Sequence, residues 1–129
     1  MTEVHRLAAA VNPLVVERSR VDGYELLAVE GELDIATAPR MIAALSEAFA
    51  DLERPLVVDL SSVDFMDSTG LALLMNAYRR VKRHGQGFAI VCPDGPIARV
   101  FEIADMVESL HVCPDRVSAR RAATQPPRG

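Results

Sequence analysis

Apolar and polar residues along the chain follow two periodicities, one typical of strands and one typical of helices. Leu14–Val21 and Tyr24–Glu30 are rich in β-branched and apolar residues, and Asp22–Gly23 lies between them. This arrangement predicts a β-hairpin, because a two-residue hairpin turn needs positive φ at its centre. The short, continuously apolar runs Leu56–Leu60 and Phe88–Cys92 are typical of strands buried on both faces, and Leu110–Cys113 predicts a short last strand.

Apolar residues at helical spacing occur between these strands. Thr37 is a candidate helix cap and Pro39 suits a first turn, ahead of a predicted apolar face made of Met41, Leu45, Ala48, Phe49 and Leu52. A second helical face, stopped by His84–Gly85, comprises Leu71, Leu74, Met75, Tyr78 and Val81. Pro96–Ala104 predicts a third helix, and Asp115 is placed to cap a fourth.

The predicted element order is β-β-α-β-α-β-α-β-α. A hairpin followed by alternating units predicts an α/β fold, with a mixed sheet of four to five strands and about four helices packed on it. We assign residues 14–121 to a single domain, residues 1–13 to an N-terminal extension, and residues 122–129 to a Pro- and Gly-bearing tail that we expect to be disordered.

The composition of the chain argues against several classes of function. The chain has 129 residues, half of them hydrophobic, and a net charge of −4 without a long basic run, which argues against binding to nucleic acid or an acidic membrane. We find no secretory signal pattern and no apolar run of the roughly 18 residues that a membrane helix needs. Cys92 and Cys113 are too few for a disulfide framework or a zinc site, so we expect buried thiols. These features predict a cytoplasmic protein without a metal or cofactor of its own.

The most unusual stretch is DFMDSTGLALLM, Asp64 to Met75, which crowds carboxylates and hydroxyls at the start of a predicted helix. Capping by Asp67, Ser68 or Thr69 accounts for one of these residues but not for all of them together. A phosphate on Ser68 would lie at the positive end of the helix dipole and beside Asp64 and Asp67. The helix could then survive modification while its surface became hostile to an acidic or apolar partner.

Two other interpretations compete with this one, a nucleotide-binding site and a hydrolase. A nucleotide-binding loop needs glycines and a lysine after a strand, whereas Gly85 and Gly87 precede one. A serine hydrolase needs glycine two residues on each side of its serine, but Met66 occupies one of these positions. It also needs a histidine, and His84 is expected at the far end of the Ser68 helix. His5 lies in the N-terminal extension, and His111 remains open.

Three stretches resemble the STAS domains of bacterial anti-sigma factor antagonists. They are VVDLSSVDFMDSTGLALLMNAYRRVKRHG (Val57–Gly85), EGELDIATAPRM (Glu30–Met41) and ARVFEIADMVESLHV (Ala98–Val112). The resemblance covers Leu14 to Val117 and implies a single STAS domain. One departure is Asp105, where the family usually ends its third helix in glycine; aspartate tolerates the left-handed conformation better than most residues.

The resemblance implies a phosphorylation-controlled binding module and not an enzyme. Ser68 would be phosphorylated by a cognate anti-sigma factor, an ATPase-type serine kinase that supplies its own Mg-ATP. The unmodified protein would bind this kinase and release the sigma factor, and a separate phosphatase would reverse the modification. The implied role is in transcription regulation and the stress response.

The resemblance also implies a partner-binding surface around Ser68. Asp67 and Thr69 flank the serine, Gly70 lets the partner approach the backbone, and Asp34 lies on the neighbouring loop. Glu32, Asp64 and Met66 complete the surface. We expect a monomer or a weak homodimer. The alternatives are a constitutive STAS adaptor in a sensory complex or lipid-transport assembly, not switched at Ser68, and more remotely a small serine hydrolase.

Overall fold

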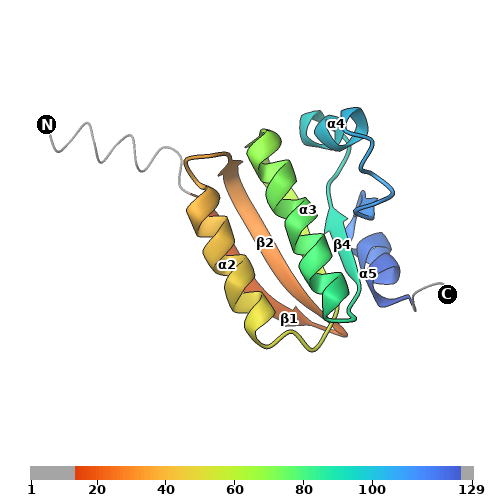
Figure 1. Cartoon of the computed structure of the whole chain (residues 1–129). Helices are drawn as coiled ribbons and strands as arrows, with labels where there is room; N and C mark the ends of the chain where they lie inside the picture. The colour runs from red at the N-terminus through yellow and green to blue at the C-terminus, as the bar shows by residue number, and fades with distance from the viewer. Residues whose placement is uncertain (1–13, 126–129) are drawn as a thin grey trace, which may run out of the picture.

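The chain folds into a five-stranded sheet with helices on both of its faces (Figure 1). The computed structural model describes residues 14–125. Its elements are β1 (Val15–Val21), β2 (Tyr24–Leu33), α2 (Ala38–Ala50), β3 (Leu56–Met66), α3 (Ser68–Arg83), β4 (Phe88–Val91), α4 (Pro96–Ile103), β5 (Val112–Cys113) and α5 (Arg116–Thr124). The predicted order of elements and the α/β class are confirmed. The N-terminal extension at 1–13 and the end of the tail at 126–129 lie outside the described residues.

The strands follow one another across the sheet in chain order, β1-β2-β3-β4-β5. β1 and β2 form the predicted antiparallel hairpin, in which Gly23 adopts a φ of 88° at the turn. The β2–β3, β3–β4 and β4–β5 pairs are parallel. A parallel pair needs a crossover connection, and α2, α3 and α4 supply the three crossovers. The sheet is therefore mixed, as the hairpin followed by alternating units predicts.

Alternate residues of the central strands face two separate apolar layers. On one face Leu27, Val58 and Ile90 belong to the larger core, together with buried residues of α2, α3 and α4. On the other face Val57 and Ala89 pack with Ala119 and Ala123 of α5, as part of a smaller cluster. β3 is thus buried on both faces over Leu56–Leu60, which is the pattern expected of a central parallel strand.

β3 is longer than the sequence pattern predicts. It was expected to end at Leu60 but continues to Met66, because residues Ser62 to Met66 pair with the second half of β2. This half of β3 exposes Ser62, Asp64 and Phe65. A strand with an exposed face has a polar pattern, which here resembled a loop.

Two contacts hold helix α5 against the sheet. One is an ion pair with the buried carboxylate of Asp59, and the other is a close approach of the helix backbone to Gly87. The Arg116 Nε donates to Asp59 Oδ2 at 2.7 Å, and Asp115 caps the helix as predicted by accepting from the Ser118 N–H. The backbone of Ala123 comes so near to Gly87 that a Cβ there would lie 1.7 Å from the Ala123 carbonyl oxygen. Residues 122–124 are therefore part of this packed helix and not of a disordered tail, which corrects the predicted domain end at residue 121.

Both cysteines are free, and they belong to opposite faces of the sheet. Cys92 lies in the larger core, whereas Cys113 packs against the α5 cluster, so the two thiols do not face each other. Burial, with the nearby charges of Asp59 and Glu102, raises the pKa of the Cys92 thiol to about 11. A thiol that stays protonated at neutral pH is a poor nucleophile and metal ligand. Asp105, just after α4, has a φ of 58° and is left-handed, as its place in the sequence suggests.

Asp59 should make the stability of the fold depend on acid. Burial alone would raise the pKa of Asp59, but hydrogen bonds from Ser61 and Arg116 hold it below its usual value. The ionised Asp59 therefore contributes its full stabilisation to the folded state above the unfolded-state pKa of about 4. This stabilisation is lost as pH falls through the lower folded-state pKa of Asp59. We expect Asp59→Asn to lower the free energy of unfolding by about 1–3 kcal/mol at neutral pH. Urea unfolding across a pH series should show this difference shrinking toward acid.

The Arg116→Gln variant supplies the matched comparison, because it removes the cation and leaves the carboxylate. It should weaken the same acid dependence without abolishing it. If Asp59→Asn retained the full acid dependence of the unmodified protein, the titration would have to come from another group.

Candidate functional site

The carboxyl ends of β2 and β3 bring two loops side by side. Leu33, near the end of β2, is the register partner of Met66, the last residue of β3, and the Asp67 N–H donates to the Leu33 carbonyl at 3.4 Å. Asp34 follows Leu33 directly and Ser68 follows Asp67. Parallel strands end at one edge of a sheet, and in open α/β sheets this edge is the usual place for a binding site.

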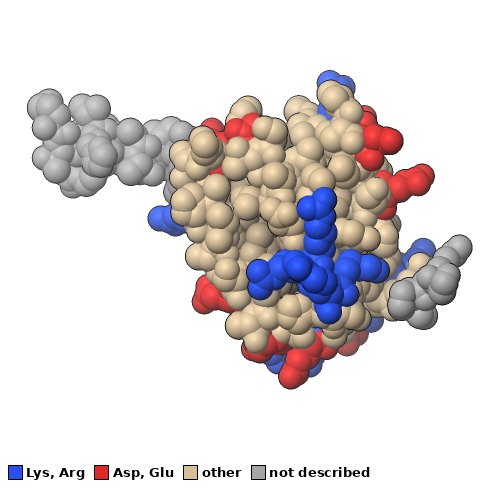
Figure 2. All heavy atoms as spheres, in the orientation of Figure 1, with Lys and Arg blue, Asp and Glu red and all other residues tan. Residues whose placement is uncertain are grey.

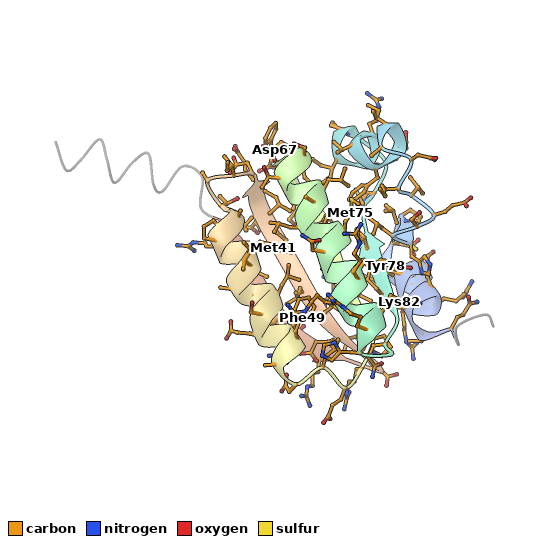
Figure 3. All side chains as sticks on the ribbon, in the orientation of Figure 1. Met41, Phe49, Asp67, Met75, Tyr78 and Lys82 are labelled. Atoms are coloured by element: carbon orange, nitrogen blue, oxygen red, sulfur yellow. The ribbon has the colours of Figure 1, made fainter. Side chains whose placement is uncertain are left out.

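Asp67 alone caps α3. Its backbone is extended, with φ −109° and ψ −169°, and its Oδ1 accepts from the Thr69 N–H at 2.9 Å. Ser68 is the first residue of the helix and is exposed, and its hydroxyl forms no hydrogen bond to any residue in the range 14–125. Of the three candidate caps, the structure therefore assigns the role to Asp67. The Ser68 hydroxyl has no structural task in the described part of the chain, whereas Asp67 lies at the start of α3 (Figure 3).

No histidine of the described range lies beside Ser68. His84 is at the opposite end of α3, where its Nδ1 donates to the Arg80 carbonyl at 2.8 Å. His111 precedes Val112, which is aligned through Ile90 with Val58 of β3. The strand from Val58 to Met66 then separates it from the site by about 26 Å at 3.3 Å per residue. His111, which the sequence leaves open, is thus too distant to act as a base, and His5 lies outside the described residues.

Asp34 organises the loop that follows β2. Its Oδ1 accepts from the N–H groups of Ala36 and Thr37 at 3.0 and 3.1 Å. The Thr37 hydroxyl donates back to the Glu32 carbonyl at 2.7 Å. Thr37 is therefore not the side-chain cap that the sequence suggests: its φ of −96° and ψ of −8° are helical, and its hydroxyl points away from the first turn of α2. Pro39 does occupy the first turn, as predicted.

Two residues of the predicted partner surface are buried instead. Met66 is only 4% exposed, and a Cβ on Gly70 would lie 2.6 Å from Met66 Cγ and 2.9 Å from Leu33 Cγ. Glycine at 70 thus lets α3 approach the ends of β2 and β3, and its absent side chain is not a feature offered to a partner. The other predicted residues are partly or fully exposed: Glu32, Asp34, Asp64, Asp67, Ser68 and Thr69.

Two exposed apolar residues beside these loops were missed by the sequence analysis. Ile35 is 77% exposed and Phe65 is 48% exposed, and Phe65 is the register partner of Glu32. Each directly follows an aspartate and precedes an apolar residue, Ile35 in LDIAT and Phe65 in VDFMD. The aspartate beside each was the available signal. The edge therefore combines an exposed hydroxyl, several carboxylates and two apolar side chains, which suits protein recognition better than catalysis.

Comparison with known proteins assigns this arrangement to one family. A family model described as the STAS domain matches residues 12–119. The anti-sigma-B factor antagonist of Staphylococcus aureus (strain NCTC 8325 / PS 47) is 31% identical over 99 residues, covering 77% of this chain and 92% of that protein. The crystal structure of an anti-sigma factor antagonist from Mycobacterium paratuberculosis has a TM-score of 0.80 and 28% identity, over 88% of this chain and 96% of that one.

The same fold also occurs within a much larger protein. The murine anion transporter Slc26a9 has a TM-score of 0.73 at 14% identity, covering 94% of this chain and 24% of the transporter chain. At that identity the likeness shows the fold alone. In the chain described here, none of the helices within residues 14–125 is long and apolar enough to cross a membrane, and those residues contain no cluster of His, Cys, Asp or Glu suited to hold a metal ion.

The free energy of unfolding of two variants tests the assignment of the cap to Asp67 and not to Ser68. Asp67→Ala removes the side-chain acceptor of the α3 cap and should lower the free energy of unfolding by about 0.5–2 kcal/mol. Ser68→Ala should stay within about 0.5 kcal/mol of the unmodified protein, since its hydroxyl bonds to nothing in the described structure. Urea unfolding followed by circular dichroism measures both. Asp64→Ala, which removes an exposed carboxylate three residues earlier, controls for the change of charge.

Equal losses in Asp67→Ala and Ser68→Ala would contradict this assignment. They would mean that the serine hydroxyl shares the capping role and is not held free for modification.

Proposed function

Since the chain belongs to the STAS domain family, we propose that it acts as an anti-sigma factor antagonist switched at Ser68. In this proposal the unmodified protein binds an ATPase-type anti-sigma factor, a serine kinase, and so frees a sigma factor in the cytoplasm. Phosphorylation of Ser68 breaks the complex, and a separate phosphatase restores it. The observation that carries the proposal is the exposed, unbonded hydroxyl of Ser68 beside a helix cap that Asp67 alone provides.

The position of Ser68 allows modification without unfolding. A phosphate there would lie at the N-terminus of the 16-residue helix α3, where the helix dipole favours an anion. The packing beneath it, between Gly70, Leu33 and Met66, is buried and does not involve the serine side chain. The domain would therefore keep its fold while its surface changed.

The surroundings of Ser68 explain how a phosphate would prevent binding. Exposed Ile35 and Phe65 offer apolar contact area. A partner that covers the whole edge would also remove water from the serine. Phosphorylation adds a charge of about −1.5 to −2 at this point, so the same contact would require desolvating an anion. Asp64 and Asp67 nearby add like charge. The modified edge would then repel an acidic or apolar partner surface.

In this mechanism the chain is a substrate and a ligand, and not an enzyme. The γ-phosphoryl group passes from the partner's Mg-ATP to the Ser68 Oγ, ADP leaves, and the hydroxyl proton is lost to a base of the kinase. The phosphatase adds water and releases inorganic phosphate. Neither step needs a catalytic base in this chain, which agrees with the distance of His84 and His111 from Ser68.

A second candidate is a constitutive adaptor that binds its partner whatever the state of Ser68. The exposed apolar residues Ile35 and Phe65 favour it, since they would offer the same contact area in a complex that is not switched. The two functions differ in one respect that can be measured, the effect of a charge at position 68 on binding.

Affinity capture from the source organism separates the two candidates. We expect a Ser68→Ala bait to recover an ATPase-type serine kinase and a Ser68→Asp bait to lose it, because the carboxylate partly imitates phosphate. Ser109→Asp, which puts the same charge on an exposed residue of the loop before β5, should recover the kinase normally. Incubation of the unmodified protein with that kinase and Mg-ATP should add one phosphate by mass spectrometry, and Ser68→Ala should accept none.

Recovery of the same partner by all three baits would support the constitutive adaptor instead. Phosphorylation at a residue other than Ser68 would leave the partner assignment intact but refute the proposed switch.

A further inference from the structure

A second surface feature lies on the α2 side of α3 and reaches from Leu73 to the C-terminal turn of the helix. A groove of about 890 Å³ runs between α2 and α3, and we name it the α2–α3 groove. Its apolar floor consists of Ile42, Leu45, Phe49, Leu73 and Ala77, and its basic rim consists of Arg79, Arg80, Lys82 and Arg83. This volume is in the range of small-molecule sites, roughly 300–1,000 Å³. None of these residues belongs to the Ser68 edge.

The rim concentrates positive charge on a chain that is negative overall. It holds four of the 14 Lys and Arg residues within Arg79–Arg83, whereas the net charge of the chain is −4. Figure 2 shows this cluster as the main basic area on the face that carries α2 and α3. None of the four forms an ion pair with a residue in the range 14–125, although several other arginines do. The C-terminus of a helix favours cations, but one or two would satisfy its dipole.

The charge and the apolar floor are in direct contact. The guanidinium of Arg80 lies over the Phe49 ring, 4.9 Å from its centroid, so this side chain reaches across from α3 to α2. Phe49 points from α2 toward α3 in the labelled view (Figure 3). Farther along the floor, Ile42 is 48% exposed and Leu73 is partly exposed. The groove thus presents a partly exposed apolar strip that ends at a group of cations without an ion-pair partner in the described range.

We propose that the α2–α3 groove binds a single-chain anionic amphiphile. Its alkyl chain would lie along Ile42, Leu45 and Leu73, and its carboxylate or phosphate head would contact Arg79, Arg80 and Arg83. Two observations favour a thin chain over a partner helix. The two helices that form the groove pack against each other, and the Arg80 side chain spans the space between them. A helix about 10 Å wide would have to displace that contact, whereas an alkyl chain would not.

The groove shares no residue with the Ser68 edge. Ser68 and Arg80 are twelve residues apart on one helix, or about 18 Å at 1.5 Å per residue, and the nearest groove residue on α3, Leu73, is five residues or about 7.5 Å from Ser68. A negative result for one site therefore leaves the other untouched.

Titration of the ¹⁵N-labelled full chain with defined amphiphiles tests the proposal. The probes are dodecanoate and dodecyl phosphate, each below its micelle concentration; the zwitterionic dodecylphosphocholine and inorganic phosphate serve as references. We expect both anionic probes to shift the amide signals of the groove residues with saturation, and to bind more weakly as salt rises. The relative affinity of the two probes distinguishes a carboxylate head from a phosphate head. Each reference compound, lacking either the net charge or the chain, should bind at least severalfold more weakly.

Matched variants identify the two halves of the site. Arg79→Gln/Arg83→Gln should weaken binding about two- to thirtyfold, the combined effect expected of two exposed ion pairs. Arg99→Gln/Arg121→Gln removes the same charge from α4 and α5 and should leave the affinity unchanged. Ile42→Ser should weaken binding through the floor, whereas Ile103→Ser, at a residue 87% exposed on α4, should not. All four variants change exposed residues and should fold.

Three outcomes would overturn the proposal. The first is no saturable shift with either anionic probe, and the second is equal weakening by the groove variants and their controls. The third is binding only to phosphatidylglycerol vesicles and not to the monomeric probes, which would make the basic face a membrane contact.

Discussion

The parallel pairing of β2 with β3, continued as far as Leu33 and Met66, is the constraint on which the rest of the candidate site depends. It brings the two following loops to one edge and places Asp34 and Asp67 each one residue beyond a paired position. It also sets the seam into which α3 must fit. Because Leu33 and Met66 fill the space where a side chain of residue 70 would project, α3 can begin at Ser68 only with glycine in its first turn. Pairing, close packing and the exposure of Ser68 are consequences of one register.

Within that edge, the residues that hold the structure together are distinct from the residue proposed to be modified. Asp67 completes the helix, Asp34 holds its own loop, and Gly70 and Met66 pack inside, so the Ser68 hydroxyl can be modified at little cost to the fold. In the proposed switch the added charge would act on the interface and would leave the fold of the domain unchanged. The exposed apolar pair Ile35 and Phe65 supplies contact area that a new charge would make costly to bury.

Helix α3 joins two surfaces of opposite character. Its N-terminus carries Ser68 among carboxylates, and its C-terminal turns carry the arginines over the apolar floor shared with α2. The helix dipole favours this polarity, with anions at the first end and cations at the last. The two proposed sites share this helix but no residue, so a coupling between them would have to act through the helix or through a shared partner.

The sequence by itself determined the order of the elements, the mixed sheet, the hairpin turn at Asp22–Gly23 and the cap at Asp115, because these follow from local periodicity and turn chemistry. It also marked Ser68 and its neighbours, through a surplus of polar groups that capping could not explain. Only the tertiary structure decided which neighbours face outward. In a strand a shift of one residue reverses the face, so the burial of Met66 and the exposure of Phe65 depended on pairing with β2. The distance of His111 from Ser68 likewise depended on the β3–β4–β5 register, which no local pattern contains.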